Sequence, residues 1–177
     1  MQRNNVLNEA TVVIYNKVKT FRYSCCILKG HGNAVMYPNP LIRIPGGDVD
    51  VWMNAERDEI RSLANSLAEN ANGHVNDDSF NHIGLTVNGI TVELHSIPDF
   101  MANFVYNRRL QIWLKQNVDE QCNNMVALPN DAGLVVVPTH SFNVVYQLYH
   151  LYHHYFYEGV GLRQVVDYYF VLVKNEE

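Results

Sequence analysis

Apolar and polar positions repeat along the chain with two different periods. Apolar residues recur every three or four positions over 6–21 and 55–69, which predicts amphipathic helices. They recur every second position over 48–53, which predicts a strand whose two faces differ chemically. A short apolar run over 23–28 predicts a buried strand. The pattern also predicts helices over 101–117, 142–157 and 162–174, a short hairpin over 125–137 and a polar surface loop over 70–78.

The strongest local signal is a predicted β-hairpin between His82 and His95. Two alternating runs flank Asn88-Gly89, the dipeptide favoured in two-residue type I′ turns, and this turn fixes the register of the strands. Glu93 is then expected on the polar face opposite Gly84, which leaves room around the carboxylate. The cross-strand pairs expected are Val87 with Ile90, Thr86 with Thr91, Leu85 with Val92, Gly84 with Glu93, Ile83 with Leu94 and His82 with His95.

Two aspartates stand on the predicted strand over 48–53. Asp48 and Asp50 are two positions apart, so their carboxylates point to the same side. Carboxylate oxygens on one face suit Mg²⁺, which also takes phosphate oxygens, and a pair of such ions clamps an in-line displacement. We expect Glu93 of the hairpin to join the same sheet on the same face. The alternative is a solvated acidic face without a ligand.

A glycine-containing turn follows the first predicted strand. Lys29-Gly30-His31-Gly32 leads into a short helix that Pro38 and Pro40 end. Backbone N–H groups at the start of a helix favour anions, but a plain tight turn explains the two glycines equally well.

Composition and charge narrow the classes of function. The chain has 177 residues, 47% hydrophobic and 18% charged, which predicts one folded unit. A formal net charge of -5 makes long duplex DNA a poor partner. Three cysteines without CxxC spacing argue against a disulfide framework, and the apolar runs are too short to span a membrane. These features predict a cytoplasmic protein.

Several motifs together suggest a family. They are Lys29-Gly30-His31-Gly32, Arg43 followed by Gly47-Asp48-Val49-Asp50, Val92-Glu93-Leu94-His95, and Gly161-Leu162-Arg163 followed by Asp167. This set resembles the DNA polymerase β-type nucleotidyltransferase superfamily, and most closely the bacterial uncharacterised nucleotidyltransferase family. The resemblance spans nearly the whole chain. It implies an α+β fold with a nucleotidyltransferase-like mixed β-sheet flanked by helices. The pattern along the chain places a seam near Pro98-Asp99, between this core over 1–98 and a mostly helical part over 99–177 packed on it.

The resemblance also implies a reaction. A nucleoside monophosphate would pass from a nucleoside triphosphate (NTP) to an acceptor hydroxyl on a protein, an RNA end or a small molecule. Asp48, Asp50 and Glu93 would be the catalytic residues and the ligands of Mg²⁺ or Mn²⁺, and Glu93 would help to deprotonate the acceptor. The nucleotide-binding residues implied are Lys29, Gly30, His31, Gly32, Arg43 and Gly47.

Other functions remain open at this stage. Gly30 is followed by His31 where the superfamily usually has serine, which favours a catalytically inactive nucleotide-binding or regulatory module. Lys29 and Arg43 are also explained as partners in surface salt bridges. Arg163 and Asp167, four apart on a helix, form either an intrahelical pair or part of a nucleotide cleft.

The predicted helix over 142–157 is rich in aromatic residues and histidines. His150 and His154 lie on one helical face near His153, which indicates either packing or a metal site. A metal-dependent phosphoester hydrolase would require one of these histidines to meet an aspartate in space. The helix is expected to form a wall of the cleft, with rings available to stack on a base.

Repulsion among three carboxylates leads to a first expectation. Asp50→Asn should leave the metal-free protein as stable as wild type or slightly more stable, while Mg²⁺-dependent triphosphate binding falls steeply. Thermal melting with and without Mg²⁺ and triphosphate measures both effects. A variant that lost stability but kept the ligand-induced shift would make Asp50 a structural residue.

Overall fold

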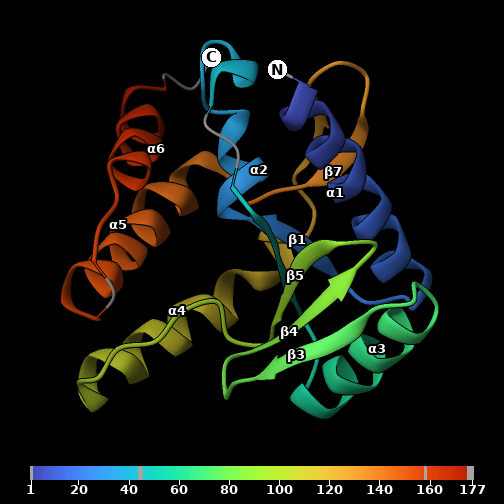
Figure 1. Ribbon diagram of the computed structural model, residues 1–177. Coiled ribbons are helices and arrows are strands. Elements are labelled where there is room, and N and C mark those ends of the chain that lie inside the picture. The colour runs from blue at the N-terminus through green and yellow to red at the C-terminus, as the bar shows by residue number, and fades with distance from the viewer. Residues whose placement is uncertain (1, 44–45, 158, 175–177) are drawn as a thin grey trace.

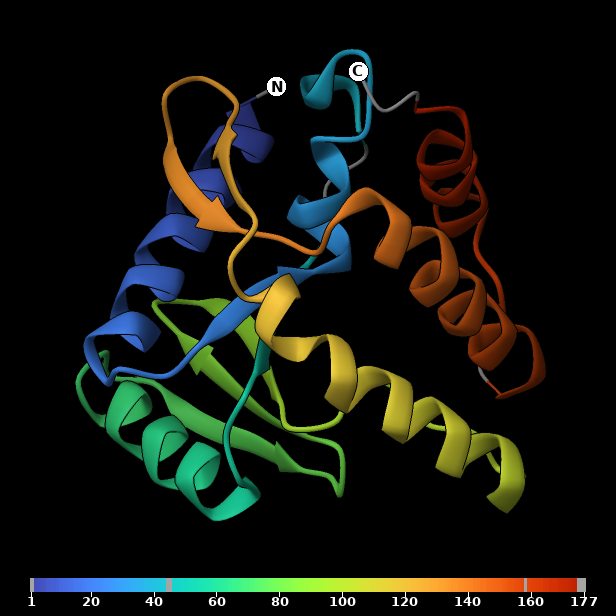
Figure 2. The same cartoon turned by 180° about the vertical axis from the view of Figure 1, so that it is seen from behind.

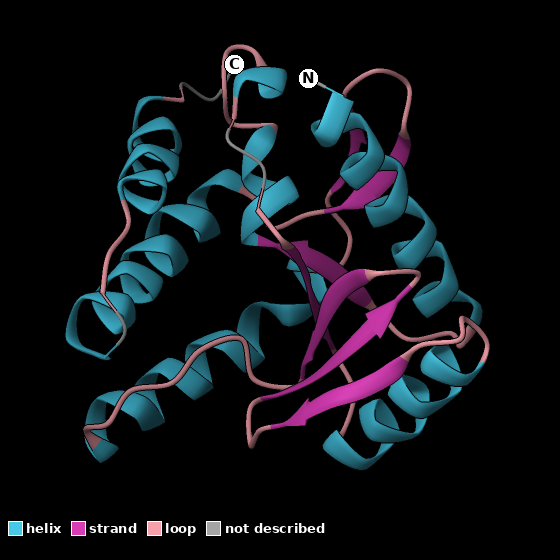
Figure 3. Ribbon diagram, viewed as in Figure 1, coloured by secondary structure: helices cyan, strands magenta, loops and turns pink. Residues whose placement is uncertain are grey.

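A five-stranded mixed sheet forms the centre of the fold, and helices flank it (Figures 1 and 3). The computed structural model describes residues 2–43, 46–157 and 159–174. The helices in these ranges are α1 (Gln2–Thr20), α2 (Lys29–Ala34), α3 (Arg57–Glu69), α4 (Phe104–Gln121), α5 (His140–Tyr157) and α6 (Leu162–Val173), with a 3₁₀ turn at Pro40–Ile42. The strands are β1 (Cys25–Leu28), β2 (Asp48–Met53), β3 (His74–Asp78), β4 (His82–Val87), β5 (Ile90–His95), β6 (Met125–Leu128) and β7 (Gly133–Val136). The α+β architecture expected from the sequence is confirmed.

The order of strands in the main sheet is β1-β2-β5-β4-β3. Strands β2 and β5 are parallel, and the other neighbouring pairs are antiparallel. Helix α3 packs over β3, β4 and β5, and α1 packs beside β1 and β7 (Figure 1). The side chains of Val49 and Val51 in β2 and of Val92 and Leu94 in β5 are fully or almost fully buried. Because side chains alternate along a strand, the polar residues of β2 and β5 lie together on the opposite face.

The hairpin of β4 and β5 has the register that the sequence predicts. Every expected pair is present, from Val87 with Ile90 at the turn to His82 with His95 at the open end. Asn88 and Gly89 both have positive φ, 51° and 77°, as a type I′ turn requires. The parallel pairing of β2 with β5 then brings Asp50 opposite Glu93.

Strand β3 is a correction to the sequence prediction, which assigned a surface loop to 70–78. His74–Asp78 instead pairs antiparallel with β4 at the edge of the sheet, with a shift of register between Val75 and Asp77. An edge strand is held by backbone hydrogen bonds to one neighbour, so it needs little apolar alternation in its sequence. Gly73 admits the close approach of the chain, because a Cβ there would lie 1.9 Å from the carbonyl oxygen of Thr86.

Helix α1 buries a face that is partly polar. Val13 and Phe21, which contribute to the predicted apolar stripe, are 48% and 43% exposed, whereas Asn4 and Asn8 are buried. The Asn4 amide donates to the carbonyl oxygen of Arg43 over 2.9 Å, and Asn8 Oδ1 lies 2.9 Å from a ring nitrogen of His31. These buried asparagines therefore hold two segments that sequence reasoning assigned to nucleotide binding.

The C-terminal half adds a second small sheet and a helical pair. Strands β6 and β7 form the hairpin predicted over 125–137, and β7 lies beside α1 (Figure 2). Helices α5 and α6 pack on each other across from the main sheet (Figure 1). None of the helices described has the length and apolarity needed to cross a bilayer.

The packing of Gly32 gives a prediction for stability. A Cβ at this position would lie 2.6 Å from the backbone oxygen of Ile27 in β1, so Gly32→Ala must displace either α2 or the strand. We expect the free energy of unfolding to fall by about 1–3 kcal/mol, the usual cost of overpacking. Gly47→Ala is the matched control, because a Cβ there meets nothing within 4 Å. Chemical denaturation of both variants measures the effect, and equal stabilities would contradict this account of α2.

Candidate active site

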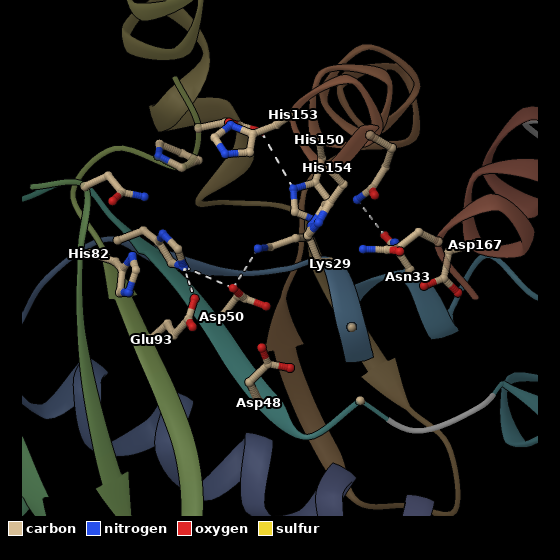
Figure 4. A pocket seen from close by; sticks show the side chains of 18 of the residues that line it. Lys29, Asn33, Asp48, Asp50, His82, Glu93, His150, His153, His154 and Asp167 are labelled. Atoms are coloured by element: carbon tan, nitrogen blue, oxygen red, sulfur yellow. Dashed lines mark hydrogen bonds and ion pairs between the residues drawn. The ribbon is translucent and has the colours of Figure 1, made fainter. Parts of the chain in front are cut away.

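A cleft of about 470 Å³ separates the polar face of the main sheet from α5 and α6 (Figure 4). Side chains from both sides line it, including Asp50 of β2, Glu93 of β5, His150 of α5 and Asp167 of α6. The C-terminal helices therefore form one wall of the cleft, as expected from the sequence.

Three carboxylates converge at the floor of the cleft. Asp48 and Asp50 project from β2, and Glu93 projects from the adjacent strand β5 at the position paired with Asp50. One oxygen from each lies within 4.8 Å of the others (Figure 4). Sequence reasoning predicted this meeting on one face of adjacent strands, and the geometry is confirmed. Three convergent oxygen donors fit a hard divalent cation such as Mg²⁺ or Mn²⁺.

Asp50 is the most constrained of these carboxylates. Lys29 Nζ lies 2.8 Å from Asp50 Oδ1, and His95 Nε2 donates to the same oxygen over 3.0 Å. His95 Nε2 also lies 3.3 Å from Glu93 Oε2. Burial alone would raise the pKa of Asp50, but Lys29 and then the hydrogen bond from His95 hold it well below its ordinary value. Burial alone would lower the pKa of Lys29, but the charge of Asp50, its hydrogen bond with Lys29 and the nearby Tyr146 and Glu93 together raise it.

The turn after β1 aims Lys29 at Asp50 through an unusual backbone conformation. Lys29 and Gly30 both have positive φ, 45° and 28°. Such a φ is uncommon for lysine and costs conformational free energy, which tertiary contacts must compensate. The ion pair with Asp50 is one such contact. Lys29 is therefore a partner within the site, and the interpretation of a surface salt bridge is wrong.

Asp48, rather than Asp50, is the carboxylate that is destabilised by its charged neighbours. Its carboxylate is half-buried, and its pKa is raised by burial, by Asp50 and by Glu93, in that order. Asp50 has two cationic or proton-donating partners, so neutralising it would leave Lys29 without its counter-ion. The expectation that Asp50→Asn preserves stability must therefore be corrected, because the argument applies to Asp48.

The residues assigned to nucleotide binding fall into two groups. Among the described residues, the lining of the cleft includes Lys29, Gly30 and Arg43 but not His31, Gly32 or Gly47. His31 instead turns toward α1, where burial and then the charge of Arg43 lower its pKa to about 4. Asn33, in the same short helix as His31, also lines the cleft, and its side chain accepts a hydrogen bond over 3.1 Å from Gln147 of α5.

Arg43 and Asp167 form a buried ion pair that ties α6 to the segment before β2. Arg43 Nε and Nη2 donate to the two oxygens of Asp167 over 2.9 Å and 2.7 Å. The hydroxyl of Tyr37 donates to the same carboxylate over 2.6 Å. Arg43 and Asp167 are each 5% exposed, so the interpretation of Arg43 as a surface pair is wrong. Bidentate geometry with a third donor is the arrangement in which a buried pair offsets its desolvation.

The histidines of α5 gather around Asp99, which sequence reasoning passed over. His153 Nδ1 lies 3.1 Å and His150 Nδ1 3.7 Å from the Asp99 carboxylate. A histidine of α5 therefore does meet an aspartate in space, which the hydrolase alternative requires. Burial, followed by the charge of Lys29, lowers the pKa of His150 to about 4. Within the part of the chain described, however, the groups of three potential ligands both contain Glu93 and neither includes an α5 histidine.

The aromatic lining of the cleft differs from the expectation. Phe80 and Phe100 line it, with ring centroids 4.5 Å apart, whereas the tyrosines of α5 are absent from the described lining. Tyr146 is fully buried and Tyr155 is 72% exposed. The stretches Ser79–Asn81 and Pro98–Phe100 flank the hairpin, and neither carries a repeating pattern that would have identified it as part of a cleft.

Comparison with known proteins adds independent support for the fold. Residues 1–177 match the family described as "Uncharacterised nucleotidyltransferase". The solution structure of the antibiotic-resistance factor ANT(2'')-Ia is similar to this chain with a TM-score of 0.61 and 8% sequence identity, covering 97% of this chain and 84% of that chain. An antigenic nucleotidyltransferase-like protein from Paracoccidioides brasiliensis is similar with a TM-score of 0.51 and 16% identity, covering 94% and 73%. At these identities the two structures establish the fold alone. The sequence has no significant match among curated proteins.

The unequal environments of the two aspartates predict opposite effects of the same substitution. Asp50→Asn leaves the buried Lys29 without its counter-ion and should cost about 3 kcal/mol. Asp48→Asn should stabilise the metal-free protein, because it removes a partly buried charge that Asp50 and Glu93 repel. The gain should be only about 0.5 kcal/mol, because solvent screens a half-buried carboxylate. The folded pKa of Asp48 is raised, so this gain is absent below its unfolded pKa of about 4 and grows as the pH rises to neutrality.

Denaturation at several pH values, in buffer with chelator, measures both changes. Asp131→Asn, at an exposed loop position, is the control and should alter stability by less than about 0.5 kcal/mol. If Asp50→Asn were stabilising, or Asp48→Asn destabilising at neutral pH, the assignment of charges within the site would be wrong.

Proposed function

The chain belongs to the Uncharacterised nucleotidyltransferase family, and on that premise we propose that it transfers a nucleoside monophosphate from an NTP to an acceptor hydroxyl. The observation that carries the proposal is the convergence of Asp48, Asp50 and Glu93 at the floor of the cleft. A cluster of this charge is costly without a cation, and an NTP arrives with Mg²⁺ or Mn²⁺ bound to its phosphates.

The carboxylates would hold the reacting groups in place. Bound there, Mg²⁺ or Mn²⁺ would neutralise phosphate charge and act as a Lewis acid on the reacting oxygens. Asp48 and Asp50 would orient the triphosphate from β2. Glu93 would accept the proton of the acceptor hydroxyl while the hydroxyl oxygen forms a bond to the α-phosphorus. The bond from the α-phosphorus to the oxygen that bridges it to the β-phosphate breaks, and pyrophosphate leaves. Most of the rate would come from positioning and charge neutralisation.

The cations of the cleft would act on the triphosphate. Lys29 lies beside Asp50 and fixes that carboxylate, while its positive charge faces the space where phosphates would bind. Arg43 lines the same cleft, and its pair with Asp167 would keep α6 against the nucleotide-binding side. We assign the nucleotide site to residues 1–98, with the helical part 99–177 closing the cleft. His31, Gly32 and Gly47 would act through the shape of the backbone.

The acceptor would enter between the hairpin and α5. Phe80, Asn81 and Phe100 lie on this side of the cleft, together with Asp99 and the histidines of α5. A protein side chain, an RNA end or a small molecule each carries the hydroxyl that the reaction needs. The free thiols Cys25, Cys26 and Cys122 suit a reducing compartment, which supports placement in the cytoplasm.

A labelling experiment tests the reaction. Each NTP, labelled at the α-phosphate, is incubated with the protein, Mg²⁺ or Mn²⁺ and cell extract, and pyrophosphate release is measured in parallel. We expect label on an acceptor with one NTP. Glu93→Gln should lower transfer at least about 100-fold, the scale of general base catalysis. Glu69→Gln, exposed at the end of α3 and outside the described lining of the cleft, should leave transfer unchanged.

The same incubations, together with a measurement of NTP binding and a repeat with γ-labelled NTP, separate the rival functions. Saturable NTP binding without pyrophosphate release, in every extract tried, would identify a nucleotide-binding or regulatory module and overturn the transferase proposal. Release of inorganic phosphate from a γ-labelled NTP, without label on any acceptor, would identify a hydrolase. Equal activity of Glu93→Gln and wild type would remove Glu93 from the mechanism.

A further inference from the structure

A second group of potential metal ligands lies beside the three carboxylates. His82 and His95 are directly opposite each other on β4 and β5, and Glu93 is two residues before His95 on the same face. One ring nitrogen of each histidine and one oxygen of Glu93 lie within 4.8 Å of one another. Figure 4 shows His82 and Glu93 next to each other at the floor of the cleft. The hairpin register therefore creates a site with two nitrogen donors and one oxygen donor.

The spacing of these donors suits a small tetrahedral ion. Zinc binds imidazole nitrogen and carboxylate oxygen at about 2.0–2.2 Å, so neighbouring ligands in a tetrahedral site are about 3.3–3.5 Å apart. His95 Nε2 and Glu93 Oε2 are already 3.3 Å apart. The ring centroids of His82 and His95 are 5.2 Å apart, and a rotation of the less buried His82 can shorten the distance between nitrogens.

The environment of His95 shows what metal binding would change at this residue. This residue is 2% exposed, and its Nδ1 is buried without a hydrogen-bond partner. A buried polar atom without a partner costs free energy, so such atoms are rare unless a ligand or function requires them. The contacts of His95 with Asp50 and Glu93 are both made by Nε2, so this nitrogen must release its proton, and with it the hydrogen bond to Asp50, when it binds the metal.

We propose that His82, Glu93 and His95 form a binding site for one zinc-class transition-metal ion, with the remaining coordination position open to the cleft. Two imidazoles and one carboxylate favour Zn²⁺ or Co²⁺ over Mg²⁺, which prefers oxygen ligands alone. The site goes beyond nucleotidyl transfer, because its metal binds without a nucleotide. It shares Glu93 with the carboxylate group, so occupation of one site changes the ligands available to the other.

The test is titration of the untagged full chain with Zn²⁺ and Co²⁺ in the absence of nucleotide. Calorimetry should show one equivalent of Zn²⁺, and Co²⁺ should give the visible absorption bands of a tetrahedral site. His82→Asn should weaken Zn²⁺ binding at least about 10-fold and remove the tetrahedral Co²⁺ spectrum. His82 is only partly buried, and melting of the metal-free variant checks that its fold is intact.

Two control variants separate this site from its neighbours. His154→Asn removes an imidazole of the α5 cluster and should leave Zn²⁺ binding unchanged. Asp48→Asn should abolish Mg²⁺-dependent triphosphate binding and keep the Zn²⁺ site. Zinc affinity in His82→Asn equal to that of wild type, loss of binding in His154→Asn, or no binding by wild type would each overturn the inference. Zinc binding that depends on His82 in a protein without transfer activity would refute the transferase proposal alone.

Discussion

The ion pair between Asp50 and Lys29 is the interaction around which the site is arranged. Two parallel strands bring three carboxylates to one face, and the most buried of them meets a lysine held at positive φ in the turn after β1. The lysine makes burial of Asp50 tolerable, and His95 adds a hydrogen bond to the same oxygen. Asp48 and Glu93 are left more exposed and face the cleft. The pair therefore leaves the uncompensated negative charge of Asp48 and Glu93 facing the cleft.

The scaffold around this pair depends on polar contacts between distant segments. Asn8 holds His31 in the turn that carries Lys29, and Asn4 holds the backbone of Arg43. Arg43 then binds Asp167 of α6, which forms the opposite wall of the cleft. The hydrophobic core fixes the sheet, while these buried hydrogen bonds and ion pairs fix how the walls stand relative to the carboxylates. Hydrogen bonds can fix this orientation because they weaken steeply when the donor and acceptor are moved out of line.

How much the sequence predicts depends on the range of the interaction. The register of the hairpin follows from local rules, a type I′ turn and alternation along a strand, and it is confirmed. The meeting of Asp50 with Glu93 was expected because the hairpin can join the same sheet and because the family resemblance implies a third acidic residue on a later strand, and the pairing of β2 with β5 confirms it. The edge strand β3 was missed because backbone pairing stabilises it without an apolar pattern. The partners of Lys29 and Arg43 were also missed, since nothing local relates residues that lie far apart in the chain. The function that we propose for the site rests on the family and on the three carboxylates.

The most direct measurement is a crystal structure with Mn²⁺ and a non-hydrolysable NTP analogue, in which anomalous scattering locates the ion. Our account predicts Mn²⁺ bound between Asp48, Asp50 and Glu93, with the triphosphate in the cleft between β2 and α6. An ion coordinated only by the α5 histidines, or a triphosphate bound outside this cleft, would contradict it.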